Sequence, residues 1–371
     1  MTASNLQATI TRPTIILDEE KCRRNIDCMK ARADENTSVL RPHFKTHQSD
    51  LVGQWLRDAG VQRATVSSVS MARYFVDHGW NDVTIAFPLN PREWPEVQQL
   101  AAKAKVNITI TSPHILDFLE QNPPASEVGF FIKIDVGTRR TGLRPTAQKE
   151  MDQIIDTLQA IEGYAFRGLL CHAGHAYQCR SQTEIQKVHE EVNAMMQGLR
   201  GRFARYEPFV ISSGDTPTCS SAQGWDGIDE MRAGNFVFYD LMQWQIGACG
   251  PADIAVCLAC PVVAKHPERN TIIIYGGGVH LSKDRIVWEN NTIFGMPVHF
   301  EEEQLQWQLP DGESYVSSIS QEHGVLQVSD DFLARTNVGD LVGILPVHSC
   351  MTADAMKRYK LTTGESIEMM Q

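Results

Sequence analysis

GFFIKIDV (residues 129–136) and FRGLLCH (residues 166–172) are two strand-like runs, and the fold class follows from them and from the segment between them. Both runs are rich in the apolar and aromatic residues that favour β-strands. Between them, apolar residues recur with the spacing of a single helical face: Met151, Ile154, Ile155, Leu158 and Ile161. The stretch therefore predicts a strand–helix–strand unit.

The same alternation extends to both sides of this unit. A second amphipathic helix is predicted after Ser181, which together with Glu184 forms a capping-box start. Eight strands separated by helices are typical of a (β/α)₈ barrel, whereas a doubly wound sheet, the alternative, usually carries fewer strands and an early Gly-rich turn. The predicted strands are 38–41, 64–69, 82–89, 107–112, 129–136, 166–172, 208–213 and 230–238.

The alternation of strand-like and helix-like segments stops after about Gln245, where strand-like runs follow one another with turns and no convincing long helix. This pattern predicts an all-β second domain. We therefore expect a barrel domain over residues 1–250 and a β domain over residues 251–371. The predicted strands of the β domain are 254–264, 271–275, 315–319, 325–328, 341–345 and a closing strand at 366–370.

Composition narrows the class of protein. The 371 residues carry a formal net charge of −11, and no run of Lys and Arg offsets it, so neither nucleic acid nor an anionic membrane surface is an expected partner. No apolar run is long enough to cross a bilayer, and residues 1–12 lack the features of a secretory signal. The nine cysteines have no framework spacing, so we expect reduced thiols and a cytoplasmic protein.

Lys45 lies just past the first predicted strand, within RPHFKTH (residues 41–47). Active sites of (β/α)₈ barrels lie at the C-terminal ends of the strands, where the loops converge. Neighbouring cations and desolvation would lower the pKa of this lysine, as an amine that bonds to a carbonyl cofactor requires. A solvated loop lysine is the alternative reading of the same spacing.

A candidate anion site follows the seventh predicted strand, in SGDTPT (residues 213–218). Small hydroxyl residues around a glycine present backbone N–H groups and side-chain donors, and barrels commonly bind phosphate in the loops after strands seven and eight. Tyr239, at the end of the eighth run, is a candidate further donor. An ordinary turn is the alternative.

A candidate metal pair lies near the C-terminus, at His348 and Cys350. In an extended segment, residues two apart point the same way, so both side chains could bind one ion. Imidazole with thiolate favours zinc over magnesium or calcium. A core cysteine beside a surface histidine is the alternative.

Taken together, these motifs resemble the D-serine dehydratase / D-threonine aldolase family, fold-type III pyridoxal 5′-phosphate (PLP) enzymes related to alanine racemase. The resemblance runs in order from residue 13 to about 354. One residue departs from the pattern: Phe44 is bulkier than the residue usual before the lysine, which bears on the size of the substrate pocket. The matching motifs are RPTIILD (12–18), RPHFKTH (41–47), DVGTRRTG (135–142), HAGHAY (172–177), SGDTPT (213–218), EHG (322–324) and HSC (348–350).

The resemblance implies a role for each candidate residue. Lys45 would carry PLP and act as the catalytic residue, and His348 and Cys350 would bind zinc. It also implies a homodimer in which the β domain covers the partner's barrel mouth. The remaining cofactor-binding residues would be Arg140 at the ring, His172, Tyr177, and Ser213, Gly214, Thr216 and Tyr239 at the phosphate.

The resemblance also implies a reaction on small D-3-hydroxy amino acids. Cys350 favours a zinc-dependent dehydratase, which would turn D-serine into pyruvate and ammonia. The alternative is a D-threonine or D-3-hydroxyaspartate aldolase, in which Mn²⁺ could replace zinc and the products would be glycine and an aldehyde. A racemase ranks third, and a non-catalytic PLP-binding protein is the alternative of another class.

Overall fold

The computed structural model describes residues 5–371, and these residues divide into two compact units. One unit comprises residues 27–45 and 53–234 and is called here the barrel unit. The other comprises residues up to 26, residues 46–52 and residues 235–371, and is called the β-rich unit. The expected domain boundary near residue 250 stays a prediction.

The barrel unit contains one sheet of eight strands, in the order β2-β9-β8-β7-β6-β5-β4-β3, with every neighbouring pair parallel. The sheet closes where the Phe44 N–H donates to the Thr65 carbonyl (2.8 Å) and the Thr65 N–H to the Pro42 carbonyl (2.9 Å). The predicted (β/α)₈ barrel is confirmed. The strands are β2 (Val39–Leu40), β3 (Ala64–Val66), β4 (Asp82–Pro88), β5 (Lys105–Ile110), β6 (Val128–Ile134), β7 (Tyr164–Cys171), β8 (Val210–Ser213) and β9 (Glu230–Met231).

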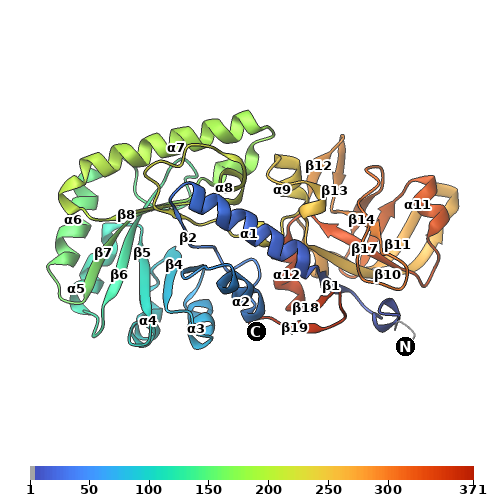
Figure 1. Ribbon diagram of the computed structural model, residues 1–371, viewed down its shortest axis with the longest axis horizontal. Coiled ribbons are helices and arrows are strands. Elements are labelled where there is room, and N and C mark those ends of the chain that lie inside the picture. The colour runs from blue at the N-terminus through green and yellow to red at the C-terminus, as the bar shows by residue number, and fades with distance from the viewer. Residues whose placement is uncertain (1–4) are drawn as a thin grey trace. The chain divides into compact units, whose positions relative to one another are not determined.

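Helices pack on the outside of this sheet, as Figure 1 shows for α3 to α7. On α6 the buried residues include Met151, Ile154 and Leu158, which confirms the predicted apolar face. The predicted cap of α7 is also confirmed, because the Glu184 N–H donates to the Ser181 side chain. The helices are α1 (Glu19–Glu35) and α2 (Asp50–Asp58), whose first residues belong to the β-rich unit, and α3 (Val69–Asp77), α4 (Trp94–Ala101), α5 (Leu116–Gln121), α6 (Gln148–Gln159), α7 (Gln182–Arg202) and α8 (Thr216–Ser221).

Phe44 belongs to the core of the barrel unit and not to a pocket. Its side chain is fully buried, and its ring centroid lies 4.6 Å from that of Phe75 and 4.7 Å from that of Trp80. The expectation that its bulk bears on the substrate pocket is therefore wrong, because the ring points into hydrophobic packing.

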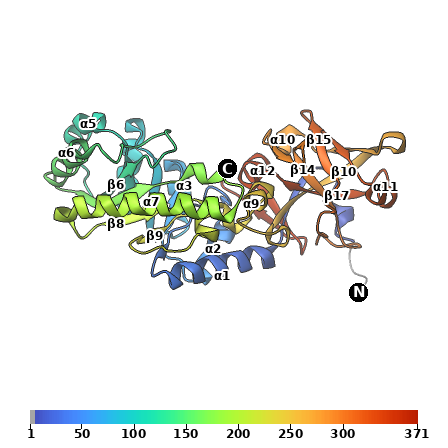
Figure 2. The same cartoon turned by 90° about the horizontal axis from the view of Figure 1, so that it is seen from above.

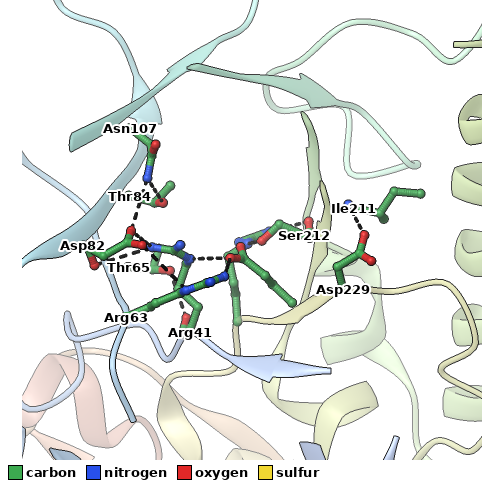
Figure 3. A network of polar contacts seen from close by, with 11 residues as sticks. Arg41, Arg63, Thr65, Asp82, Thr84, Asn107, Ile211, Ser212 and Asp229 are labelled. Atoms are coloured by element: carbon green, nitrogen blue, oxygen red, sulfur yellow. Dashed lines mark hydrogen bonds and ion pairs between the residues drawn. The ribbon is translucent and has the colours of Figure 1, made fainter. Parts of the chain in front are cut away.

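A partly buried ion network joins strands near the barrel closure (Figure 3). Arg41 Nη1 lies 2.7 Å from Asp82 Oδ1, and Arg41 Nε lies 2.9 Å from Glu230 Oε1. Arg63 Nη1 shares the same Glu230 oxygen at 2.9 Å. The two arginines and two carboxylates thus balance one another and bridge β2, β4 and β9.

The β-rich unit is built on a mixed sheet with the path β15-β16-β11-β10-β1-β18-β19, in which β1 and β18 are parallel and the other neighbouring pairs antiparallel, and β17 pairs with β10 and β14. Figure 2 shows these strands with only short helices beside them. The strands are β1 (Thr14–Leu17), β10 (Val256–His266), β11 (Thr271–Tyr275), β12 (Ile286–Trp288), β13 (Asn291–Ile293), β14 (Gly295–His299), β15 (Tyr315–Ile319), β16 (His323–Gln327), β17 (Leu341–Pro346), β18 (Arg358–Leu361) and β19 (Ser366–Glu368). The helices are α9 (Leu241–Ile246), α10 (Gly278–Leu281), α11 (Asp330–Arg335) and α12 (Ser349–Met356).

The predicted mostly β character of the C-terminal region is confirmed, although strands β1, β12, β13, β14 and β18 were not predicted. Strand β1, which the sequence analysis did not predict, lies inside this sheet between β10 and β18. The predicted strand 230–238 ends at Met231, because residues 235–237 form a 3₁₀ turn. Within residues 5–371, no helix combines the length and the apolar character needed to span a membrane.

Candidate functional site

The predicted site residues fall into two groups. Lys45, Arg140, His172, Tyr177 and the 213–216 loop belong to the barrel unit and follow the C-terminal ends of β2, β6, β7 and β8. In a parallel barrel these ends meet at one mouth. The other predicted residues belong to the β-rich unit: Tyr239, His348 and Cys350.

The loop after β8 has the geometry of a backbone cradle. Gly214 has φ +156°, and a Cβ on it would lie 2.5 Å from the Arg232 backbone nitrogen, so the position requires glycine. Asp215 caps α8 by accepting hydrogen bonds from the Thr218 N–H and Oγ1–H, each at 2.8 Å. Burial raises the pKa of Asp215 to about 7, against the effect of these two bonds. The loop is thus held by its own side chains.

His172 and Tyr177 join this loop. Nδ1 of His172 lies 2.9 Å from the Gly214 carbonyl oxygen, and the Thr216 N–H lies 3.4 Å from the Tyr177 hydroxyl. Burial lowers the pKa of His172 to about 3, so its imidazole is neutral at physiological pH. The structure therefore brings together four of the residues predicted for the cofactor, with Ser213 next to them in the chain.

Two further cations, Lys133 on β6 and Arg232 after β9, were not predicted from the sequence, and both are buried. Burial lowers the pKa of His43 and His172, and the charges of Lys45, Lys133 and Arg232 lower it further. Burial, then Arg232 and Arg140, lower the pKa of Lys133 to about 8. Lys133 had a signal in the sequence, because it is the one charged residue in the otherwise apolar run 128–134.

This cluster fits an anionic cofactor. Arg232 donates from Nε to the Ser212 hydroxyl at 2.8 Å and from Nη2 to the Cys171 carbonyl, so it is held by neutral groups. Among residues 5–371, no carboxylate forms an ion pair with Lys133 or Arg232. Buried cations without a carboxylate are costly unless a negative group compensates them. A cofactor phosphate at this mouth would supply that charge.

Tyr239 lies between the 3₁₀ turn at 235–237 and α9, in the β-rich unit. It is buried and has φ +49°. Its predicted contact with the phosphate stays a prediction, as do the individual roles of the other cofactor residues.

The local geometry of the metal pair differs from the prediction. His348 is the N-cap of α12, and Cys350 lies in the first turn of that helix, so the segment is not a strand. The argument from an extended backbone is therefore wrong. The two side chains nevertheless share a hydrogen bond, because the chain turns into the helix directly after His348.

The pair lies among polar and anionic groups of the β-rich unit. Cys350 Sγ lies 3.2 Å from Thr46 Oγ1 and 3.4 Å from Asn235 Nδ2, and both groups can donate to it. Burial lowers the pKa of His348, but the hydrogen bond and charge of Cys350, followed by Asp240 and Asp284, raise it to about 10. Such an anionic environment also attracts a divalent cation.

Within residues 5–371, no group of three or more His, Cys, Asp or Glu side chains is arranged to hold a metal ion. Catalytic zinc sites usually have three protein ligands and one open position, so a pair of protein ligands would leave one position more than usual to water and substrate. The donor set, one imidazole and one thiolate, fits zinc.

Two family descriptions match this chain. The alanine racemase N-terminal domain matches residues 17–241, and a serine dehydratase domain matches residues 255–362. The D-threo-3-hydroxyaspartate dehydratase of Delftia sp. HT23 is 30% identical over 369 residues, covering 96% of this chain and 95% of that protein. The D-serine dehydratase of Dictyostelium discoideum is 26% identical, covering 96% and 94%.

The Delftia enzyme also has a solved structure, with a TM-score of 0.88, 28% identity and 99% of each chain covered. A D-threo-3-hydroxyaspartate dehydratase has also been solved as a histidine-to-alanine variant, and as a cysteine-to-alanine variant in the metal-free form, with the cysteine two positions after that histidine.

Proposed function

Because this chain belongs to the D-serine dehydratase / D-threonine aldolase family of alanine-racemase-like enzymes, we propose that it is a PLP- and zinc-dependent lyase of D-3-hydroxy amino acids. Its first proposed reaction is the dehydration of D-serine to pyruvate and ammonia. The observation that carries the proposal is the His348–Cys350 pair, with Cys350 Sγ 3.2 Å from the hydroxyl of Thr46, the residue that follows Lys45 in the chain.

The proposed roles follow the chemistry of the side chains. PLP, when bound, supplies an electron sink for charge that develops at the substrate's α carbon. The Lys45 amine anchors the cofactor and accepts the α proton. Arg140, Lys133 and Arg232 supply positive charge around Lys45, while His172, Tyr177 and the 213–216 loop orient the cofactor's anionic groups together with Tyr239.

His348 and Cys350 would hold the zinc ion, whose chemistry is Lewis-acid assistance to a departing hydroxyl. A metal-free cysteine variant of a D-threo-3-hydroxyaspartate dehydratase supports the cysteine as a ligand, since its histidine and cysteine are spaced as His348 and Cys350 are. The identity of the ligands also supports zinc over manganese, because thiolate is a poor ligand for manganese.

A second candidate reaction is the dehydration of D-threo-3-hydroxyaspartate. The observation in its favour is the 30% identity to the Delftia enzyme over nearly the whole chain. This substrate carries a second carboxylate, so the two dehydration reactions differ in the charge that the pocket must accept.

The test is product analysis with the PLP-loaded, zinc-supplemented enzyme. D-serine, D-threonine and D-threo-3-hydroxyaspartate are each incubated, and keto acid, ammonia and glycine are quantified, with the L-isomers as controls. Keto acid with equimolar ammonia supports the proposal, and the faster substrate identifies the preferred reaction. Glycine with an aldehyde would identify an aldolase, and no turnover of any of these with PLP bound would favour a non-catalytic binding protein.

We further propose that the enzyme is a homodimer and works in the cytoplasm. The family resemblance supports the dimer, and composition supports the compartment. Light scattering of the purified PLP-loaded protein would give a mass near twice 41.6 kDa, and a mass of one chain would contradict the dimer.

A further inference from the structure

We propose that Asp284 is a positioning residue for the metal site: its carboxylate holds the imidazole of His348 so that Nε2 is presented to zinc. The proposal rests on the proposed function, since it takes His348 to be a zinc ligand. It assigns a role to a residue that no motif in the sequence indicates.

The contact itself is specific. Nδ1 of His348 lies 2.7 Å from Asp284 Oδ2, a distance typical of a charge-assisted hydrogen bond. Among residues 5–371, His348 is the one ion-pair partner of Asp284. A carboxylate that forms a single ion pair, and forms it with a candidate ligand, is well placed to act through that ligand.

The loop that carries Asp284 is also fixed. Asp284 follows α10 and precedes β12, and its N–H donates to the Ser282 hydroxyl at 3.1 Å. The other end of the contact is equally constrained, because α12 is tied to α10 through the Thr352 hydroxyl, which donates to the Leu281 carbonyl at 3.2 Å. The 2.7 Å contact therefore joins two anchored segments.

The chemistry follows from the acceptor. A carboxylate accepts at Nδ1, so Nδ1 must carry the proton, and in a neutral imidazole the lone pair is then on Nε2. Metal-binding histidines commonly donate their second ring nitrogen to a carboxylate, which fixes the ring and raises its basicity. Asp284 thus selects the tautomer that a Nε2-bound zinc ion needs.

A second carboxylate near the pair has a different role. Asp240 is buried and accepts hydrogen bonds from Asn235 Nδ2 at 2.8 Å and from the Ser349 N–H at 3.0 Å. It fixes the backbone between the two ligands, whereas Asp284 contacts the imidazole ring. Replacing Asp284 should therefore change the orientation of the His348 ring and leave the backbone of residues 348–350 intact.

The test measures zinc affinity by competition with a chromophoric chelator, using the PLP-loaded protein. Asp284→Asn should bind zinc about 10- to 100-fold more weakly, the range found for such outer ligands. Asp284→Glu, which keeps a carboxylate, should recover part of that loss. Asp331→Asn is the matched control, because Asp331 is an exposed carboxylate of the same unit that pairs with Arg335 and does not contact His348.

Substitution with cobalt separates positioning from unfolding. Asp284→Asn should retain the thiolate-to-cobalt absorption band at saturating metal, because Cys350 is unchanged, and should keep the visible absorbance of PLP. If Asp284→Asn and the wild type bind zinc equally while Cys350→Ala does not bind it, the role of Asp284 is wrong and the proposed metal site stands. If the wild type itself binds no zinc, both the metal site and this inference fail.

Discussion

Lys45 lies in a group of cations and neutral histidines, and this environment bears on its proposed chemistry. His43 is half-buried, and desolvation of its ring, followed by the charge of Lys45, keeps its pKa well below the usual range. Two imidazoles, those of His43 and His172, are thus neutral and do not compete with the amine for a proton. Replacing Lys45 therefore tests the proposed cofactor site most directly.

Replacing Lys45 by Ala should abolish covalent attachment of PLP, because no other amine is proposed to carry it. The measurement is borohydride reduction followed by peptide mapping: the wild type should be labelled at Lys45 alone. Lys187→Ala, an exposed lysine on α7, is the control and should be labelled as the wild type is. Labelling of another lysine in the wild type would contradict the assignment.

Lys133 gives a prediction for pH dependence. Burial lowers its pKa from 10.5 to about 8 in the folded protein. The unfolded chain therefore binds more protons between these values, and the stability of the cofactor-free protein should rise with pH from about 8 to 10.5. Below pH 8 the charged lysine destabilises the fold, by roughly 3 kcal/mol.

Lys133→Met removes this cost and should stabilise the cofactor-free protein below pH 8, with an advantage over the wild type that shrinks toward pH 10.5. Urea denaturation of both proteins across this range measures the difference. A constant difference at all pH values would show that Lys133 is not perturbed.

Among the elements, β1 shows how a segment can belong to a unit distant in sequence. Its four residues pair with β10 on one side and with β18 on the other, so an N-terminal strand lies inside the sheet of the β-rich unit. Ile15, Ile16 and Leu17 are fully buried there. The strand is therefore part of the core of this unit.

Ile16→Ala should lower the free energy of unfolding by about 2–5 kcal/mol, the range for truncating a buried isoleucine. The measurement is chemical denaturation monitored by tryptophan fluorescence. Val287→Ala is the matched control: its side chain is 63% exposed, and its replacement should change stability by no more than about 0.5 kcal/mol. Equal effects of the two variants would contradict the role of β1.

The two units of the molecule carry different proposed sites, one for the cofactor and one for the metal. Most of the proposed cofactor residues, including Lys45, belong to the barrel unit, and both proposed metal ligands belong to the β-rich unit. The loop proposed to hold the phosphate is fixed by Asp215 and His172, which are also in the barrel unit. Cofactor binding and metal binding should therefore be separable.

Treatment with EDTA should abolish keto-acid formation while the visible absorbance of PLP persists, and added zinc should restore activity. Cys350→Ala should behave as the chelated enzyme does. Metal analysis of the active enzyme measures its zinc content, and steady-state assays measure the rate of keto-acid formation. Full turnover of D-serine by metal-free protein would refute the zinc site and, with it, the preference for a dehydratase.

Strands, helix faces and motifs could be predicted from the amino-acid sequence alone, because each depends on residues that are close together in the chain. Runs rich in apolar and aromatic residues predict all eight barrel strands, and the period of apolar residues predicts the faces of α6 and α7, because both signals repeat within a few residues. The ordered motifs identified the family and the candidate residues for the same reason: each motif is a short continuous run. Helix α12 was missed because HSC is too short a run to show a period.

Only the tertiary structure decided which distant groups meet. Thr46 and Cys350 are 304 positions apart, and Asp284 and His348 are 64 apart, so no spacing rule relates them. The same holds for Lys133 and Arg232, whose charges act on one another because β6 and β9 belong to one closed sheet. Phe44 shows that a motif can also mislead. Its place next to Lys45 suggested that it bears on the substrate pocket, but its ring is buried in the core against Phe75 and Trp80.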